Sequence, residues 1–121
     1  FEPIVRMTTT YIEPGDQTFE QLIAPIQKGY YIKTISHGSG MSTFTIAPRL
    51  AYEIENGHLG KPTQISVITG SVFETLGLID GLSNELTLLS FVTGGCGKME
   101  QQGLPVGFGG PCVRVSEMNV Q

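Results

Sequence analysis

Alternation of apolar and polar residues predicts several extended segments. Residues 4–11 (IVRMTTTY) are β-branched, sulfur-containing or aromatic at most positions, as is typical of a strand. Alternating residues also surround Asn56-Gly57, the strongest short hairpin signal in the chain, and predict two or three antiparallel strands. Residues 85–92 (ELTLLSFV) and 111–120 (PCVRVSEMNV) predict further strands. We therefore expect β-structure to dominate the fold.

Apolar residues at helical spacing predict two short helices. The first, over residues 19–30, can be capped by Asp16 or Thr18, and an internal proline should shorten or kink it. The second, over residues 72–79, can be capped by Ser71. Both helices are too short to dominate the architecture.

Between the first helix and the predicted hairpin, residues 30–36 (YYIKTIS) are typical of a strand, and His37-Gly38-Ser39-Gly40 after them is typical of a loop. The predicted fold class is α+β and β-dominated: a mostly antiparallel sheet or flattened barrel, partly covered by two short helices. We find no internal repeat or charged linker. Residues 1–121 therefore form a single domain, which we expect to be part of a longer protein.

The charge distribution argues against two classes of partner. The formal net charge is −4, and the seven Lys and Arg residues form no basic run that could follow phosphates or an anionic lipid surface. No apolar stretch approaches the roughly 20 residues needed to cross a bilayer. We expect no direct binding of nucleic acid or membrane, and a cytoplasmic location.

The segment Gly94-Gly95-Cys96-Gly97-Lys98 carries the clearest chemical signal. Glycines on both sides allow backbone to approach a ligand closely, and Lys98 can favour the thiolate that binds metal or attacks as a nucleophile. The alternative is a small buried thiol on an ordinary turn. A disulfide to Cys112 is a further alternative, disfavoured in a reducing compartment.

A complete zinc site is not indicated, because Cys96, Cys112, His37 and His58 are isolated from one another in sequence. Cys96 remains compatible with a catalytic zinc that takes its other ligands from elsewhere in a longer chain. A competing hypothesis makes Cys96 a nucleophile with His37 as its base. His58 is expected to be a solvated hairpin residue, and Cys112 a core residue of its strand.

Arg6 stands in an otherwise apolar or hydroxyl-bearing strand. It can clamp a peptide carboxylate or a backbone carbonyl, or it can simply face solvent. Together with His37, Gly38 and Gly95 it forms our predicted set of substrate-binding residues. Phosphate binding is not predicted, because no helix begins after the glycine-rich segments.

Taken together, these segments resemble the carboxyl-terminal part of the TldD/PmbA family, known as modulators of DNA gyrase and as zinc peptidases. The resemblance covers nearly the whole chain and rests on five pieces: RMTTTY, EPGDQTFEQLI, AYEIENG, GSVFETLGLI and CGKMEQQGLPVGFGGPCVRV. The last piece is the most specific. Its cysteine is typical of the TldD branch and is missing from the TldE/PmbA branch.

The resemblance implies a zinc metallopeptidase that cleaves unfolded or short peptides. An HExxxH helix, absent from this sequence, would supply two His ligands and a Glu general base, and Cys96 would be the third ligand. A TldE/PmbA-like subunit would be the partner. The chain alone should be inactive. The alternative within the same family is a non-catalytic TldE/PmbA-like partner or scaffold subunit.

The sequence departs from the family pattern at two places. The loop that is usually glycine-rich is here SHGSGMSTF and contains His37, so the substrate side is expected to differ. The last residues read MNVQ where the family commonly has two glycines. Neither departure involves Cys96.

Overall fold

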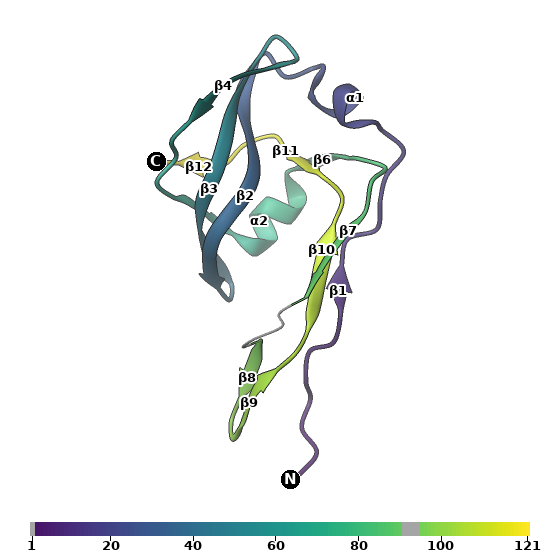
Figure 1. Ribbon diagram of the computed structural model, residues 1–121, viewed down its shortest axis with the longest axis vertical. Helices are drawn as coiled ribbons and strands as arrows, with labels where there is room; N and C mark the ends of the chain where they lie inside the picture. Colours follow the sequence, from purple (N-terminus) through teal and green to yellow (C-terminus); the bar gives the residue numbers. More distant parts are fainter. Residues whose placement is uncertain (1, 91–94) are drawn as a thin grey trace.

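Strands dominate the part of the chain that this computed structural model describes, residues 2–90 and 95–121. Figure 1 shows an elongated molecule, with the largest sheet and both helices toward one end and a small hairpin toward the other. The strands pair almost entirely antiparallel, in open sheets and without barrel closure among the described residues. The predicted β-dominated α+β class is confirmed.

The largest sheet has the strand order β12-β5-β3-β2, and β4 also pairs with β3. All its pairs are antiparallel. Its members are β2 (Lys28–Gly40), β3 (Thr43–Glu55), β4 (His58–Thr63), β5 (Ile68–Ser71) and β12 (Asn119–Val120). Strand β12, near the carboxyl terminus, therefore forms one edge of the sheet, and β2 forms the opposite edge.

The predicted hairpin turn joins β3 to β4. Asn56 and Gly57 both have positive φ angles, 49° and 77°, as a two-residue type I′ turn requires. Their amides donate to the carbonyls of Gln27 and Ile26, which attaches the turn to the segment after the first helix. The prediction of antiparallel strands around this turn is confirmed.

A small apolar core lies against this sheet. Ala51, Ile65 and Ile68 are buried, and partly buried hydrophobic residues pack around them. These surrounding residues are Ile32, Ile46 and Met118. The core therefore joins strands from the middle of the chain to its carboxyl-terminal segment.

Helix α1 spans Phe19–Ile23 and is shorter than predicted. Of the two candidate caps, Thr18 is the one used: its Oγ1 accepts from the Gln21 amide at 3.1 Å, and the Gln21 side chain accepts from the Thr18 amide at 2.9 Å. The predicted extension to Tyr30 is wrong, because β2 begins at Lys28 and its pairing with β3 fixes an extended backbone there.

Helix α2 spans Val72–Gly77 and follows Ser71 as predicted, although the Ser71 side chain makes no capping bond. The helix ends before Ile79, which starts β6 (Ile79–Leu82). Pairing of β6 with β11 (Val113–Val115) accounts for this earlier end. Of the residues predicted to be helical, Ile79 is therefore in a strand, and Leu78 is the C-cap of the helix.

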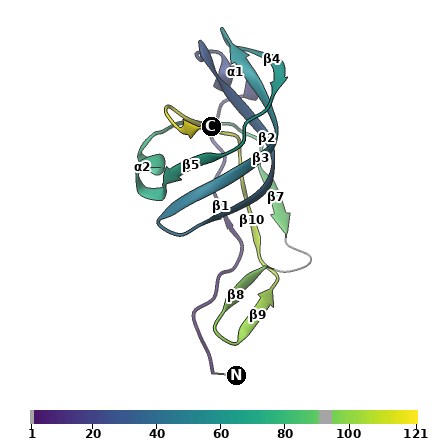
Figure 2. The ribbon, with the colours of Figure 1, turned by 90° about the vertical axis from the view of Figure 1, so that its left-hand side faces the viewer.

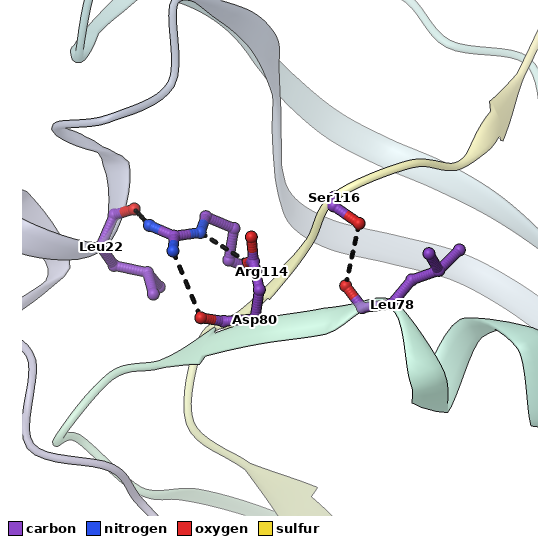
Figure 3. A network of polar contacts seen from close by, with 5 residues as sticks. All are labelled: Leu22, Leu78, Asp80, Arg114 and Ser116. Carbon is purple, nitrogen blue, oxygen red and sulfur yellow. Dashed lines mark hydrogen bonds and ion pairs between the residues drawn. The ribbon is translucent and has the colours of Figure 1, made fainter.

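Arg114 of β11 ties three elements together (Figure 3). Its Nε donates to Asp80 Oδ1 in β6 at 2.7 Å, and its Nη1 donates to the carbonyl of Leu22 in α1 at 2.8 Å. Nearby, the Ser116 hydroxyl donates to the Leu78 carbonyl at 3.2 Å. These bonds dock α1 and the carboxyl-terminal segment on β6.

A second sheet has the order β1-β10-β7 and is made of β1 (Thr10–Tyr11), β10 (Gly107–Gly110) and β7 (Thr87–Ser90). The β1–β10 pair is parallel. The predicted strand over residues 4–11 is therefore wrong for 4–9, which pair with no strand among the described residues. Residues 91 and 92 of the predicted strand 85–92 lie outside the described residues. The predicted strand 111–120 is divided into β11 and β12.

The predicted loop at His37–Gly40 is also wrong, since these residues form the end of β2. Their partners are residues 44–47 of β3, in a regular antiparallel register. Glycine permits a loop but does not require one, and the ladder bonds to β3 make the extended form the stable one here. The SHGSGMSTF segment is thus the tip of a long β-ribbon.

Candidate functional site

Cys96 opens the small hairpin formed by β8 (Cys96–Lys98) and β9 (Gln101–Leu104). Figures 1 and 2 place this hairpin beside the amino-terminal segment, at the end of the molecule away from the β2–β3 ribbon. Cys96 is a free, half-buried thiol and is paired across the hairpin with Leu104. A thiol in this setting can react or bind a metal, because it is neither oxidised nor fully enclosed.

Gly95 determines how the chain enters this hairpin. Its φ angle is +109°, a conformation that residues with a side chain rarely adopt. A Cβ atom at this position would also collide with the carbonyl oxygen of Leu104. Gly95 is therefore required for the placement of Cys96, whereas Gly94 lies outside the described residues.

Arg6 contacts both strands of the hairpin. Its Nη2 donates to the Cys96 carbonyl at 2.6 Å, and its Nη1 donates to Gln101 Oε1 at 3.0 Å. Its Nε is shielded from solvent and has no acceptor among the described residues. Arg6 is half-buried, so the solvent-facing alternative is not what the structure shows. Its role toward a peptide remains a prediction.

Two further side chains fasten the amino-terminal segment to the hairpin. Lys98 Nζ donates to the Val5 carbonyl at 3.1 Å, and Gln101 Nε2 donates to the Glu2 carbonyl at 3.3 Å. The sequence did not identify Gln101 as a residue of the candidate site. The only signal for it in the sequence is its position five residues after Cys96. The sequence shows two separate family-like pieces, and the structure brings them into contact.

The two histidines lie elsewhere. His37 and Gly38 are exposed in the edge strand β2, and His58 is the exposed first residue of β4, as expected for a hairpin residue. Cys96 and His37 belong to different sheets, so the structure gives the hypothesis of a Cys/His nucleophile pair no support. Across residues 2–90 and 95–121, no three His, Cys, Asp or Glu side chains come together as a metal site.

Cys112 is half-buried and free, so the alternative of a Cys96–Cys112 disulfide is not realised. Its amide donates to the Ser83 hydroxyl at 2.9 Å, and its side chain is a neighbour of Tyr31. Burial raises the pKa of Tyr31, and the neighbouring Cys112 raises it further. Cys112 is thus part of the packing between β2 and the carboxyl-terminal segment.

Two findings bear on the wider classification. Within the described part of the chain, no helix has the length and apolarity needed to cross a membrane. The sequence profile of the PmbA/TldA metallopeptidase C-terminal domain matches residues 1–121. The protein is therefore a metallopeptidase-family domain. The chain belongs to the TldD/PmbA family and corresponds to its carboxyl-terminal domain.

Curated relatives agree with this assignment. The chain is 37% identical over 119 residues to a metalloprotease of Methanothermobacter thermautotrophicus, covering 94% of this chain and 25% of the relative. It is 34% identical over 121 residues to a metalloprotease TldD homolog of Haemophilus influenzae, with 98% and 25% coverage. It is 32% identical over 119 residues to a zinc metalloprotease TldD homolog of Saccharolobus solfataricus, with 97% and 26% coverage. The chain thus spans about a quarter of the length of these relatives.

Solved structures support the fold. TldE from Thermococcus kodakarensis matches with a TM-score of 0.71 at 21% identity, covering 92% of this chain and 23% of that one. A putative modulator of a DNA gyrase from Thermotoga maritima matches with a TM-score of 0.61 at 22% identity, with the same 92% and 23% coverage. At these identities the likeness concerns the fold alone.

Proposed function

We propose that the full-length protein is a zinc-dependent peptidase of unfolded or short peptides, and that this chain supplies Cys96 as one zinc ligand. One observation carries the proposal. Cys96 is a free, half-buried thiol on a hairpin whose entry and position are constrained by Gly95 and Arg6. The names of the relatives, metalloprotease and zinc metalloprotease, support the same chemistry.

The chain fits a single ligand of such a site. A catalytic zinc commonly has three protein ligands and one open position, and the described residues hold no group of three potential ligands. The family resemblance assigns the other two ligands to the His residues of an HExxxH helix outside this chain, with its Glu as general base. Bound zinc would lower the pKa of a water molecule and polarise the peptide carbonyl. The chain alone is therefore expected to be inactive.

The edge strand β2 is suited to binding the peptide backbone. Among the described residues β2 pairs with β3 alone, so one side of His37 and Gly38 is left for another strand. An extended peptide can add to such an edge through main-chain hydrogen bonds, which tolerate many sequences. Arg6, which lies beside Cys96, and Gly95, through its exposed backbone, are the proposed contacts near Cys96. A TldE/PmbA-like subunit is the proposed partner, and the cytoplasm the proposed location.

The test is a comparison of metal content and peptidase activity in the full-length protein. Cys96→Ala is measured beside the unmutated protein, with and without the TldE/PmbA-like subunit. Cys112→Ala is the matched control, because Cys112 is also a free, half-buried thiol but lies in the packing around Tyr31. We expect Cys96→Ala to lose zinc and turnover and Cys112→Ala to keep its zinc.

Two other outcomes would contradict the proposal. Full zinc content and turnover in Cys96→Ala would remove Cys96 from the metal site. Absence of zinc and of turnover in the unmutated protein, with the partner present, would favour the non-catalytic partner or scaffold. Chelator-sensitive hydrolysis by the 121-residue chain alone would contradict the expectation that its site is incomplete.

A further inference from the structure

We propose that Arg6 is a positioning residue that holds Cys96 in the place where it binds zinc. The inference rests on the proposed role of Cys96 as a ligand and extends it to a residue 90 positions away in the sequence. Three properties of the structure lead to it: the isolation of the hairpin, the bridging geometry of the guanidinium, and the attachment of the segment around Arg6.

The β8–β9 hairpin has little of its own to fix its position. It forms a separate two-stranded sheet, and the register shifts between Cys96 and Lys98. Its residues are exposed, except Cys96 and Gln101, which are half-buried. A two-stranded hairpin without a covering layer is marginally stable in water. Contacts from outside the hairpin must therefore restrict where Cys96 lies.

Arg6 supplies such a contact to both strands at once. One guanidinium nitrogen binds the main chain of Cys96 in β8, and another binds the side chain of Gln101 in β9. Hydrogen bonds from a charged donor are about twice as strong as bonds between neutral groups. Because the guanidinium is planar and rigid, the two bonds fix the orientation of the hairpin as well as its distance.

The backbone around Arg6 is held by the same hairpin. Lys98 binds the carbonyl of Val5, and Gln101 binds the carbonyl of Glu2. Figure 1 shows the amino-terminal segment running beside β8 and β9 before it reaches β1. From β1 onward the segment is anchored by parallel pairing with β10. Arg6, together with Lys98 and Gln101, thus connects the hairpin to the segment that leads into β1 of the second sheet.

The Arg6→Lys substitution would separate two contributions of the arginine side chain, its positive charge and its planar pair of hydrogen-bond donors. Lysine keeps the positive charge but lacks the planar pair of donors, so one ammonium cannot reproduce both bonds in the same geometry. If Arg6 acts by holding the hairpin in place, Arg6→Lys should loosen the hairpin and weaken zinc binding almost as much as Arg6→Ala does. If Arg6 acts only through its charge, Arg6→Lys should behave as the unmutated protein does.

The experiment uses the full-length protein and its Arg6→Lys and Arg6→Ala variants, with Arg49→Lys as control. Arg49 is an exposed residue of β3 in the largest sheet, so its substitution makes the same chemical change away from the hairpin. Amide hydrogen exchange over residues 95–104 and the rate of Cys96 alkylation by iodoacetamide are measured on metal-free protein. Zinc affinity is then measured by competition with a chromophoric chelator.

In both Arg6 variants we expect faster exchange over residues 95–104, an altered rate of Cys96 alkylation and a zinc affinity weaker by about 10- to 100-fold, as for groups that orient metal ligands. The melting temperature should stay close to that of the unmutated protein. The thiolate-to-cobalt absorption band of the Co²⁺ form should shift or weaken, which a purely structural role would not cause. Arg49→Lys should change none of these quantities.

Unchanged exchange and alkylation in Arg6→Lys would overturn the proposal, whatever the zinc affinity. Cys96→Ala separates this failure from a failure of the proposed function. If Cys96→Ala binds zinc normally while Arg6→Lys loosens the hairpin, Arg6 still positions Cys96 and only the metal role of the thiol is lost. If Cys96→Ala loses zinc while Arg6→Lys changes nothing, Cys96 is a ligand and Arg6 does not position it.

Discussion

Arg114 and Asp80 form an ion pair of 2.7 Å between β11 and β6, and the arginine side chain is the more buried partner, 19% exposed against 49%. Arg114 also donates to the main-chain carbonyls of Leu22 and Asp80, at 2.8 and 3.3 Å. The two members of the pair are therefore unequal. Removing the arginine leaves carbonyls without their donor, whereas removing the carboxylate loses only the ion pair.

The first prediction follows from this asymmetry. Arg114→Ala should lower the free energy of unfolding by about 2–3 kcal/mol, because the partly buried Leu22 carbonyl loses its donor and the ion pair is lost as well. Asp80→Ala should cost less, about 0.5–1 kcal/mol, as is usual for an exposed ion pair. Urea denaturation of the purified domain measures both. Equal losses in the two variants would contradict the idea that the carbonyl contacts of Arg114 matter more than its charge pair.

The second prediction concerns Gly57 of the β3–β4 turn. A Cβ atom there would lie 2.6 Å from the Ala24 carbonyl oxygen, at a φ angle of +77°. Gly57→Ala should therefore destabilise the domain by about 1–3 kcal/mol. Gly77→Ala is the control, since its Cβ atom would meet nothing within 4 Å and Gly77 lies in α2. Urea denaturation should show this control to be neutral or stabilising by up to about 1 kcal/mol.

The third prediction compares the two helix caps. Thr18 makes a complete capping box with Gln21, whereas the side chain of Ser71 makes no capping bond to α2. Thr18→Ala should cost about 1 kcal/mol of stability, and Ser71→Ala only a few tenths. Thermal unfolding of the two variants measures the difference. A larger loss in Ser71→Ala would show that Ser71 contributes through contacts other than capping.

The fourth prediction is a pH dependence. Burial and the neighbouring Cys112 raise the pKa of Tyr31 above its usual value of 10.0. Since the unfolded chain loses this phenol proton first, the stabilisation is fully present below pH 10 and is lost as the pH rises through the folded-state pKa. Tyr31→Phe should therefore lose less stability between pH 8 and pH 11 than the unmutated domain. Tyr30→Phe, at an exposed position, should follow the unmutated domain.

The sequence predicted those structural features that depend on residues close together in the chain, and it failed where a feature depends on pairing with a distant strand. The Asn56-Gly57 turn and the Thr18 cap are set by residues within a few positions, and both appear as predicted or among the predicted choices. His37–Gly40 was misassigned because its extended form depends on pairing with β3. Residues 4–9 were misassigned for the opposite reason: their residue types favour a strand, but they pair with no strand in the described part of the chain.

The candidate site shows the same division. Cys96 could be selected from its glycine-rich surroundings and from the family resemblance, because both are properties of one short segment. The contact of Cys96 with Arg6 and the role of Gln101 could not be predicted. No pattern in the segment around Arg6 or in the hairpin segment reveals that these two segments are neighbours. Long-range pairing, such as that of β1 with β10, is what brings them together.

The long sequence separation between Arg6 and Cys96 also affects the order in which parts of the protein can fold. The two residues are 90 positions apart, so during synthesis Arg6 emerges long before the hairpin that it binds. Chains are made at roughly 5–20 residues per second, which leaves several seconds in which the guanidinium has no hairpin to hold. The β3–β4 turn binds only residues that are made before it, Ile26 and Gln27, and can form within that time. The surroundings of Cys96 are therefore completed near the end of folding, after most of the domain has been made.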